Sequence, residues 1–263
     1  MIGKYLEVIK KSFLMNITFR IEYFAGIINI LLMVFVNVAI WKAIYEEEEV
    51  VSGVQFSIVI TYIIIGILLQ NIFMMDENFI QNKVRSGLIA ADFLKPISFR
   101  LYTFCYNIGN LLFKILLQFI PTLVVIILTF KLLPPFSTMM AVWFGLSLIL
   151  GFLILYNLNC IIWFSSFWFY SIFSLVIIKD AIILILSGAV LPLWFMPQFL
   201  LNIAKLTPFS SIYYVPLSIY LGQIPEDEIL LNFGIQLFWL VFLFGVSQFL
   251  WSKAVKKLVV QGG

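Results

Sequence analysis

The sequence predicts an all-α integral membrane protein with six transmembrane helices. Of its 263 residues, 63% are hydrophobic and 11% are charged, whereas soluble domains contain roughly 45–50% apolar and about 25% charged residues. The mean hydropathy is +1.10 over the whole length, so apolar runs make up most of the chain and not one anchor. The charged residues gather between these runs. Residues 1–263 are therefore predicted to form a single transmembrane domain.

Residues 1–20 are predicted to form an amphipathic helix in the membrane interface. Apolar residues such as Leu6 and Phe13 alternate at roughly helical spacing with Lys4, Lys10 and Lys11. The apolar run that follows lacks the short core and small-residue cleavage site of a secretory leader. A removable signal peptide is therefore not expected.

The first three predicted spans are separated by charged segments. The first covers about residues 21–45, enough at about 1.5 Å per residue to cross ~30 Å of hydrocarbon. It ends at four glutamates, residues 46–49, which form either a solvated loop or a surface that gathers cationic substrate. The second span covers about residues 56–75. The third begins between residues 101 and 111 and ends near Phe130.

The second half of the chain supplies the other three predicted spans. Residues 139–178 are too long for one span, so a fourth helix is expected to turn between residues 163 and 174. The fifth span, about residues 179–193, is short for a full crossing. Residues 192–228 contain several prolines, which favour short re-entrant or interfacial helices on the outer side. The last span covers about residues 229–251.

The distribution of charge predicts that both termini face the cytoplasm. With alternate loops assigned to the inside, that side receives all 16 lysines and arginines except Lys42, Lys131 and Lys205. The outer loops hold two acidic runs, residues 46–49 and 226–228. This partition follows the positive-inside rule. The formal net charge of +3 is too small to indicate a nucleic-acid partner.

The sequence contains no group that predicts catalysis, cofactor binding or metal binding by this chain. It has no histidine, no phosphate-binding loop and no nucleophile-elbow motif. Cys105 and Cys160 lie beside apolar segments and lack the spacing of a metal or disulfide framework. Lys179 and Asp180 are interpreted either as a gate pair or as charges at the cytoplasmic start of the fifth helix, where they would reach water.

The longest hydrophilic interruption, residues 76–100, carries the first family resemblance. Its segment Gly87-Leu-Ile-Ala-Ala-Asp-Phe-Leu-Lys-Pro96 resembles the cytoplasmic loop of type-2 ABC exporter permeases, where an apolar run ends in leucine, a basic residue and proline. The resemblance implies a coupling helix that docks on an ATPase subunit. The implied docking residues are Gln81, Asn82, Lys83, Arg85, Leu88, Asp92, Phe93 and Lys95. The alternative is a loop whose charges only set the topology.

A second resemblance lies between the last two spans. The segment Ser187-Gly-Ala-Val-Leu-Pro-Leu-Trp-Phe-Met-Pro197, continued through residues 206–209 and 214–222, is similar to the glycine and proline succession of these permeases. Met196 stands where phenylalanine is expected. The resemblance implies outer helices that cap the translocation path, with gate residues Gly188, Pro192, Pro197, Pro208 and Pro216. The alternative is an outer loop that merely packs on the helices.

The tail, residues 251–263, runs from the last span through lysines to Gln-Gly-Gly and resembles one branch of these permeases with a separately encoded ATPase. The resemblance covers nearly the whole chain. It implies a bacterial plasma-membrane exporter subunit of the drug or antibiotic type, which dimerises with the same or a related permease chain. Two copies of the ATPase subunit would bind it, and ATP and Mg²⁺ would be held there. The competing hypotheses are a non-transporting membrane scaffold and a passive channel.

Overall fold

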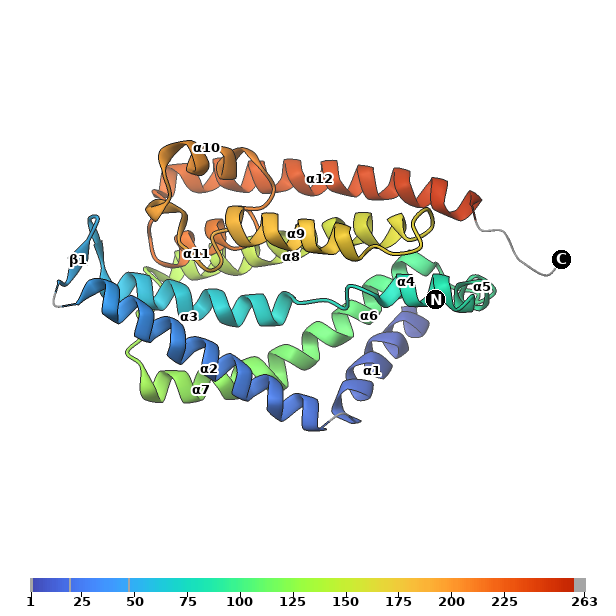
Figure 1. The fold of residues 1–263 in the computed structure, drawn as a ribbon, viewed down its shortest axis with the longest axis horizontal. Coiled ribbons are helices and arrows are strands. Elements are labelled where there is room, and N and C mark those ends of the chain that lie inside the picture. The colour runs from blue at the N-terminus through green and yellow to red at the C-terminus, as the bar shows by residue number, and fades with distance from the viewer. Residues whose placement is uncertain (1, 19, 47, 258–263) are drawn as a thin grey trace. The chain divides into compact units, whose positions relative to one another are not determined.

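The computed structural model describes residues 2–18, 20–46 and 48–257, so the last residues of the predicted tail lie outside the described part of the chain. The chain divides into two compact units. Unit 1 consists of Met1–Met75 and Asp92–Leu133, and unit 2 consists of Asp76–Ala91 and Pro134–Gly263. Helices make up nearly all of the regular structure (Figure 1), which confirms the all-α prediction.

Five helices in the described residues are long and apolar enough to cross a membrane. Their spans are Tyr23–Tyr45, Phe56–Phe73, Phe99–Thr129, Thr138–Ser165 and Glu226–Lys256. The helix at the place of the fifth predicted span is α9, Phe173–Leu186, with 14 residues. At about 1.5 Å per residue this helix is about 21 Å long, which is shorter than the hydrocarbon layer.

Unit 1 contains the N-terminal helix and the first three spans. Its elements in chain order are α1 (Ile2–Thr18), α2 (Arg20–Tyr45), β1 (Val50–Val51), β2 (Val54–Gln55), α3 (Phe56–Phe73), α6 (Phe99–Phe113), η1 (Lys114–Phe119) and α7 (Ile120–Thr129). The two short strands form an antiparallel hairpin. Its turn residues, Ser52 and Gly53, have φ angles of 52° and 79°, as a two-residue turn that follows the strand twist requires.

The third span begins at Phe99, earlier than predicted, because α1 satisfies the polar residues in its first half. The Ser12 hydroxyl lies 2.7 Å from both the Tyr106 carbonyl oxygen and Asn110 Oδ1. Asn16 Nδ2 donates to the same Oδ1 atom at 2.7 Å. A side chain at Gly109 would lie 2.5 Å from a backbone oxygen of α1, so the two helices meet without space for one.

The middle of the third span is a π-helix, η1. Pro121, two residues beyond it, has no N–H and its ring crowds the carbonyl one turn earlier, so the backbone there cannot keep regular α-helical bonding. The Lys114 ammonium donates to the carbonyls of Asn71 and Met74 at 3.1 and 2.7 Å. This lysine therefore satisfies backbone oxygens at the end of α3.

Unit 2 contains the remaining helices and residues 187–228, which are mostly predicted to face outward and are here called the outer segment. Its elements are α4 (Phe79–Arg85), the first part of α5 (Leu88–Phe93), α8 (Thr138–Ser165), α9, η2 (Leu193–Phe195), α10 (Gln198–Leu206), α11 (Tyr214–Tyr220) and α12 (Glu226–Lys256). The long helices α8 and α12 lie side by side (Figure 1) and α11 packs on α8. Ser137 caps α8 by accepting from the Met140 N–H at 3.1 Å.

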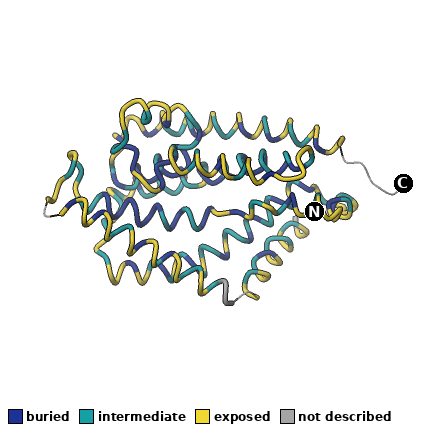
Figure 2. The backbone as a smooth tube through the Cα atoms, viewed as in Figure 1, coloured by how far each residue is buried: buried dark blue, intermediate teal, exposed yellow. Residues whose placement is uncertain are grey.

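The pattern of burial fits helices in lipid. In Figure 2, α3 is buried along most of its length, whereas α2 and α12 carry long exposed stretches. Large apolar side chains such as Leu32 on α2 and Phe238 on α12 are about three-fifths exposed, at 59% and 61%. Exposing such a continuous apolar surface to water would be unfavourable, so lipid or a protein partner covers it.

Candidate functional site

Residues 76–100, which the charge distribution predicts to face the cytoplasm and which are here called the inner segment, contain two short helices, α4 and α5. They are joined through Ser86 and Gly87, and Gly87 has a φ of 73°, which glycine adopts without strain. The chain passes from unit 2 to unit 1 between Ala91 and Asp92, inside α5. One end of the inner segment is therefore built into each unit.

The eight docking candidates differ in exposure. Asn82, Arg85, Leu88 and Lys95 are exposed, Lys83 and Phe93 are half-buried, and Gln81 and Asp92 are buried. Leu88 is 62% exposed, and Leu94, beside the candidates, is 87% exposed. Two apolar side chains thus project from the exposed part of the inner segment.

The buried candidate Gln81 is occupied inside unit 2. Its Oε1 atom accepts from the backbone N–H of Ile172, in the turn between α8 and α9, at 3.1 Å. The side chain is 4% exposed. Because its acceptor oxygen is used within the chain, Gln81 holds α4 to this turn.

The other buried candidate, Asp92, pairs with Lys95 at 2.5 Å. The hydrogen bond to Asp92 raises the pKa of the Lys95 ammonium, although burial acts against it. The same ammonium lies 5.5 Å from the centre of the Tyr102 ring. Phe93 stacks on Phe99 with ring centres 5.5 Å apart. These contacts attach the end of the inner segment to α6.

Aromatic contacts attach α4 to the end of α8 and the turn that follows it. Trp163 Nε1 donates to the Asp76 carbonyl at 3.1 Å, and its ring meets Phe79 edge-on. The Arg85 guanidinium lies 4.1 Å from the centre of the Tyr170 ring, a cation–π geometry. Arg85 is nevertheless exposed, so it remains reachable from outside the chain.

A buried polar group, here called the Lys179 cluster, joins α9, α8 and the residues before α4. It consists of Lys179, Glu77 and Asn159. Lys179 Nζ lies 2.5 Å from Glu77 Oε1 and 2.8 Å from Asn159 Oδ1. Its third close oxygen is Asp180 Oδ1, at 3.1 Å. Burial raises the pKa of Glu77, and the hydrogen bond from Lys179 offsets this only in part.

The position of this cluster corrects the sequence interpretation of Lys179 and Asp180. They do not begin the fifth helix, because α9 starts at Phe173 and both residues lie in its middle. Lys179 is only 7% exposed, and its charge meets Glu77, 102 positions away in the chain. Sequence reasoning missed Glu77 and Asn159; the available signal was a charged pair inside a strongly apolar run.

The outer segment, residues 187–228, contains the five predicted gate residues. Gly188, Pro192, Pro208 and Pro216 are buried, and Pro197 is exposed. The Tyr214 N–H donates to the Ser187 carbonyl at 3.0 Å, and the Phe136 N–H donates to the Tyr220 carbonyl at 2.9 Å. The segment therefore folds back on the end of α9 and on the residues that lead into α8.

A buried amide and a glycine fix the outer segment to α8 and α12. Gln236 on α12 is fully buried; its Nε2 donates to the Ser211 carbonyl at 2.8 Å and its Oε1 accepts from the Ser147 hydroxyl at 3.1 Å. On α8, a Cβ atom at Gly151 would lie 2.7 Å from the Ile212 carbonyl oxygen. Gln236 was not singled out from the sequence, since one glutamine in an apolar run carries no specific motif.

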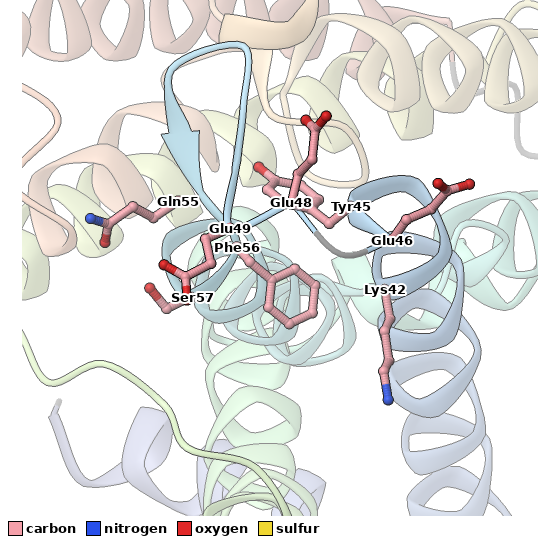
Figure 3. Close-up of a pocket in the computed structure, with 8 residues that line it drawn as sticks. All are labelled: Lys42, Tyr45, Glu46, Glu48, Glu49, Gln55, Phe56 and Ser57. Atoms are coloured by element: carbon pink, nitrogen blue, oxygen red, sulfur yellow. The ribbon is translucent and has the colours of Figure 1, made fainter.

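Unit 1 has a pocket of about 490 Å³ between the end of α2, the hairpin and the start of α3. Its lining residues are Lys42, Tyr45, Glu46, Glu48, Glu49, Gln55, Phe56 and Ser57. Figure 3 shows the carboxylates of Glu46, Glu48 and Glu49 pointing in different directions. Because they do not converge, the geometry favours the solvated-loop interpretation of these glutamates over a cation-gathering surface.

Comparison with known proteins identifies the family. A search of curated proteins found no match to this chain. A family model described as ABC-2 family transporter protein matches residues 31–262, which include both the inner and the outer segments. The chain therefore belongs to the ABC-2 family and is a type-2 ABC permease, a multi-pass membrane component of an ABC transporter.

Proposed function

We propose that this permease is the membrane subunit of an ATP-driven exporter that docks a separate ATPase on its inner segment. The observation that carries the proposal is the exposure of Leu88 and Leu94 on a segment otherwise attached to its own chain. Exposed leucines on a cytoplasmic loop are costly unless a partner covers them. Arg85 and Lys95 flank them and offer charged contacts to an acidic rim.

The rest of the assembly follows from this docking. The permease dimerises with the same or a related chain to enclose the path, and two ATPase copies bind below. ATP and Mg²⁺ are held by the ATPase, because this sequence has no phosphate-binding loop. The complex lies in a bacterial plasma membrane, with both termini of the permease in the cytoplasm as the charge distribution predicts.

In this proposal the outer segment is the gate on the far side of the path. Its support is the burial of Gly188, Pro192, Pro208 and Pro216 among helices that join the outer segment to α8 and α12. Pro197, which is exposed, marks the surface of the gate that meets the outside. ATP-driven movement opens and closes this segment.

Docking is tested by co-purifying the permease with the ABC ATPase encoded beside it. The double variant Leu88→Ser, Leu94→Ser should reduce the amount of co-purified ATPase by about tenfold or more. A tenfold reduction corresponds to about 1.4 kcal/mol of binding free energy. Leu206→Ser is the matched control, because Leu206 is 76% exposed on the outer segment and should leave docking unchanged.

Two results would contradict the proposal. One is undiminished ATPase retention by the double leucine variant. The other is unchanged ATP turnover on addition of the parent permease, which is the outcome that a membrane scaffold predicts.

A further inference from the structure

We infer that the Lys179 cluster is a connection through which movement of the inner segment reaches α8 and α9 and, through them, the outer segment. The inference rests on the proposed function, because an ATPase must move the inner segment. It assigns Lys179, Glu77 and Asn159 as positioning residues for the transport cycle. All contacts on which it depends lie within unit 2.

The first step is that one buried ammonium joins three parts of the chain. The Lys179 ammonium donates to Glu77 Oε1 and Asn159 Oδ1, and the exposed carboxylate of Asp180 lies 3.1 Å from it as an ion-pair partner. Glu77 precedes α4, Asn159 lies on α8 and Asp180 lies on α9. Since Lys179 itself lies on α9, its two hydrogen bonds join α9 to the inner segment and to α8.

The second step is that α4 is attached to the same helices at two further points. The Asp76 carbonyl accepts from Trp163 on α8, and Gln81 accepts from the backbone of Ile172 in the turn before α9. With the Lys179–Glu77 contact, three hydrogen bonds therefore attach α4 and the residues before it to α8, to α9 and to the turn between them. Displacement of α4 by a docked partner therefore carries the ends of α8 and α9 with it.

The third step is that both helices lead to the outer segment. On α8, Asn159 lies in the cluster, while Ser147 and Gly151 contact the outer segment and its anchor Gln236. The twelve residues between Asn159 and Ser147 correspond to about 18 Å of regular helix. The helix α9 ends at Leu186, and the carbonyl of the next residue, Ser187, accepts from the Tyr214 N–H. A continuous set of bonded elements thus joins the two segments.

The chemistry of the cluster suits a contact that changes during a cycle. Replacing a buried ion pair by apolar side chains is often neutral or stabilising, so stability alone does not account for this one. Glu77 Oε2 is buried without a hydrogen-bond partner among the described residues, which also leaves the pair short of its most stable arrangement. A charged contact can break and re-form between two defined geometries. Apolar side chains in its place would fix the relative position of the helices less specifically.

The test follows movement of the outer segment in the complex of permease and ATPase held in lipid nanodiscs. A cysteine placed at Lys205, an exposed position on α10, is labelled with a maleimide in the absence of nucleotide and with ATP plus vanadate. Complexes without the new cysteine give the background from Cys105 and Cys160. In the parent, nucleotide should change the labelling rate by about threefold or more, a separation that resolves coupled from uncoupled variants.

Lys179→Met should still retain the ATPase and hydrolyse ATP, but its labelling rate should no longer respond to nucleotide. The exchange variant Glu77→Lys, Lys179→Glu should recover at least about half of the response, because the ion pair is restored with reversed polarity. Asp180→Asn is the matched control. Its side chain is 57% exposed, and its removal should leave the response intact.

A Lys179→Met complex that retains the ATPase and responds like the parent would overturn the inference. If that variant fails to accumulate, the neutral pair Glu77→Gln, Lys179→Gln removes both charges together, and a parent-like response there has the same consequence. A parent whose labelling ignores nucleotide while ATP is hydrolysed also overturns it. By contrast, a parent that binds no ATPase contradicts the proposed function itself.

Discussion

The inner and outer segments are attached to the same membrane helices by different means. The inner segment is held by side chains, through the Lys179 cluster, Gln81 and Trp163, and it leaves Leu88 exposed. The outer segment is held by backbone bonds, close glycine contacts and one buried amide, and most of its helix α11 is buried. Single side-chain substitutions can therefore weaken the attachment of the inner segment, whereas the attachment of the outer segment depends on close contact between backbones.

The largest effect is expected where backbones meet, at Gly151. The change Gly151→Ala places a methyl group 2.7 Å from the Ile212 carbonyl oxygen, so α8 and the outer segment must separate. We expect a loss of about 2–3 kcal/mol in the free energy of unfolding, as for overpacked cores. Thermal unfolding in detergent measures it.

Gly145→Ala is the matched control for this prediction, because Gly145 lies on the same helix and nothing is within 4 Å of a Cβ there. It should be neutral or stabilise the helix by up to about 1 kcal/mol. Equal losses at the two glycines would remove the distinction between the two kinds of attachment.

Gln236 on α12 is a buried polar anchor of the outer segment. Gln236→Leu removes the donor to the Ser211 carbonyl and the acceptor of the Ser147 hydroxyl. We expect a loss of about 2 kcal/mol, within the range for buried groups left without partners. Asn232→Leu, at a partly exposed position one turn earlier, should change stability by less than about 0.5 kcal/mol. Similar values for both variants would contradict the anchoring role.

The inner segment should respond less to loss of a single contact. Gln81→Leu deprives the Ile172 N–H of its side-chain acceptor, and we expect a loss of about 1 kcal/mol. The exposed neighbour Asn82, changed to Leu, is the control and should have little effect. A loss at Gln81 larger than that at Gln236 would reverse the comparison.

The smallest effect is a dependence on pH. Burial raises the pKa of Glu77 above its ordinary value of 4.5, so the folded protein holds this proton more tightly than the unfolded chain does. Protonation of Glu77 therefore stabilises the folded protein. This stabilisation is complete below pH 4.5 and is lost as the pH rises through the raised pKa. The unfolding temperature of the parent should therefore fall relative to Glu77→Gln on going from acid to neutral pH. If the unfolding temperature of the parent rises relative to that of Glu77→Gln over this pH range, the prediction is wrong.

The helices that could be predicted from the sequence are those bounded by charge. The helices α2 and α3 were predicted to within a few residues, because an apolar run in lipid ends where carboxylates or lysines begin. The helix α12 continues past its predicted span at both ends and includes residues 226–228, Lys253 and Lys256. The start of the third span was predicted too late, because Asn110 finds partners on α1. The start of α9 was wrong because Lys179 is neutralised by Glu77, a neighbour that only the fold supplies.

For the site, the sequence marked residues 76–100 and 192–228 as candidate segments, but it did not predict how their side chains are used within the fold. Leu88 and Arg85 are exposed as docking requires, but Gln81 turns inward to a backbone N–H. Local sequence pattern cannot distinguish the exposed Arg85 from the buried Gln81, because both lie in the same polar stretch. The anchor Gln236 depends on the approach of Ser211, which no spacing along the chain specifies.

The wide turn of η1 has a consequence for insertions and deletions. A π-helix corresponds to an α-helix with one residue inserted, so deleting one residue from Lys114–Phe119 would restore regular pitch there. Everything beyond would rotate by about 100° relative to the first half of the helix. Thr122 and Ile126, now buried, would leave their neighbours. We therefore expect related sequences to vary in this stretch by substitution and to keep its length constant.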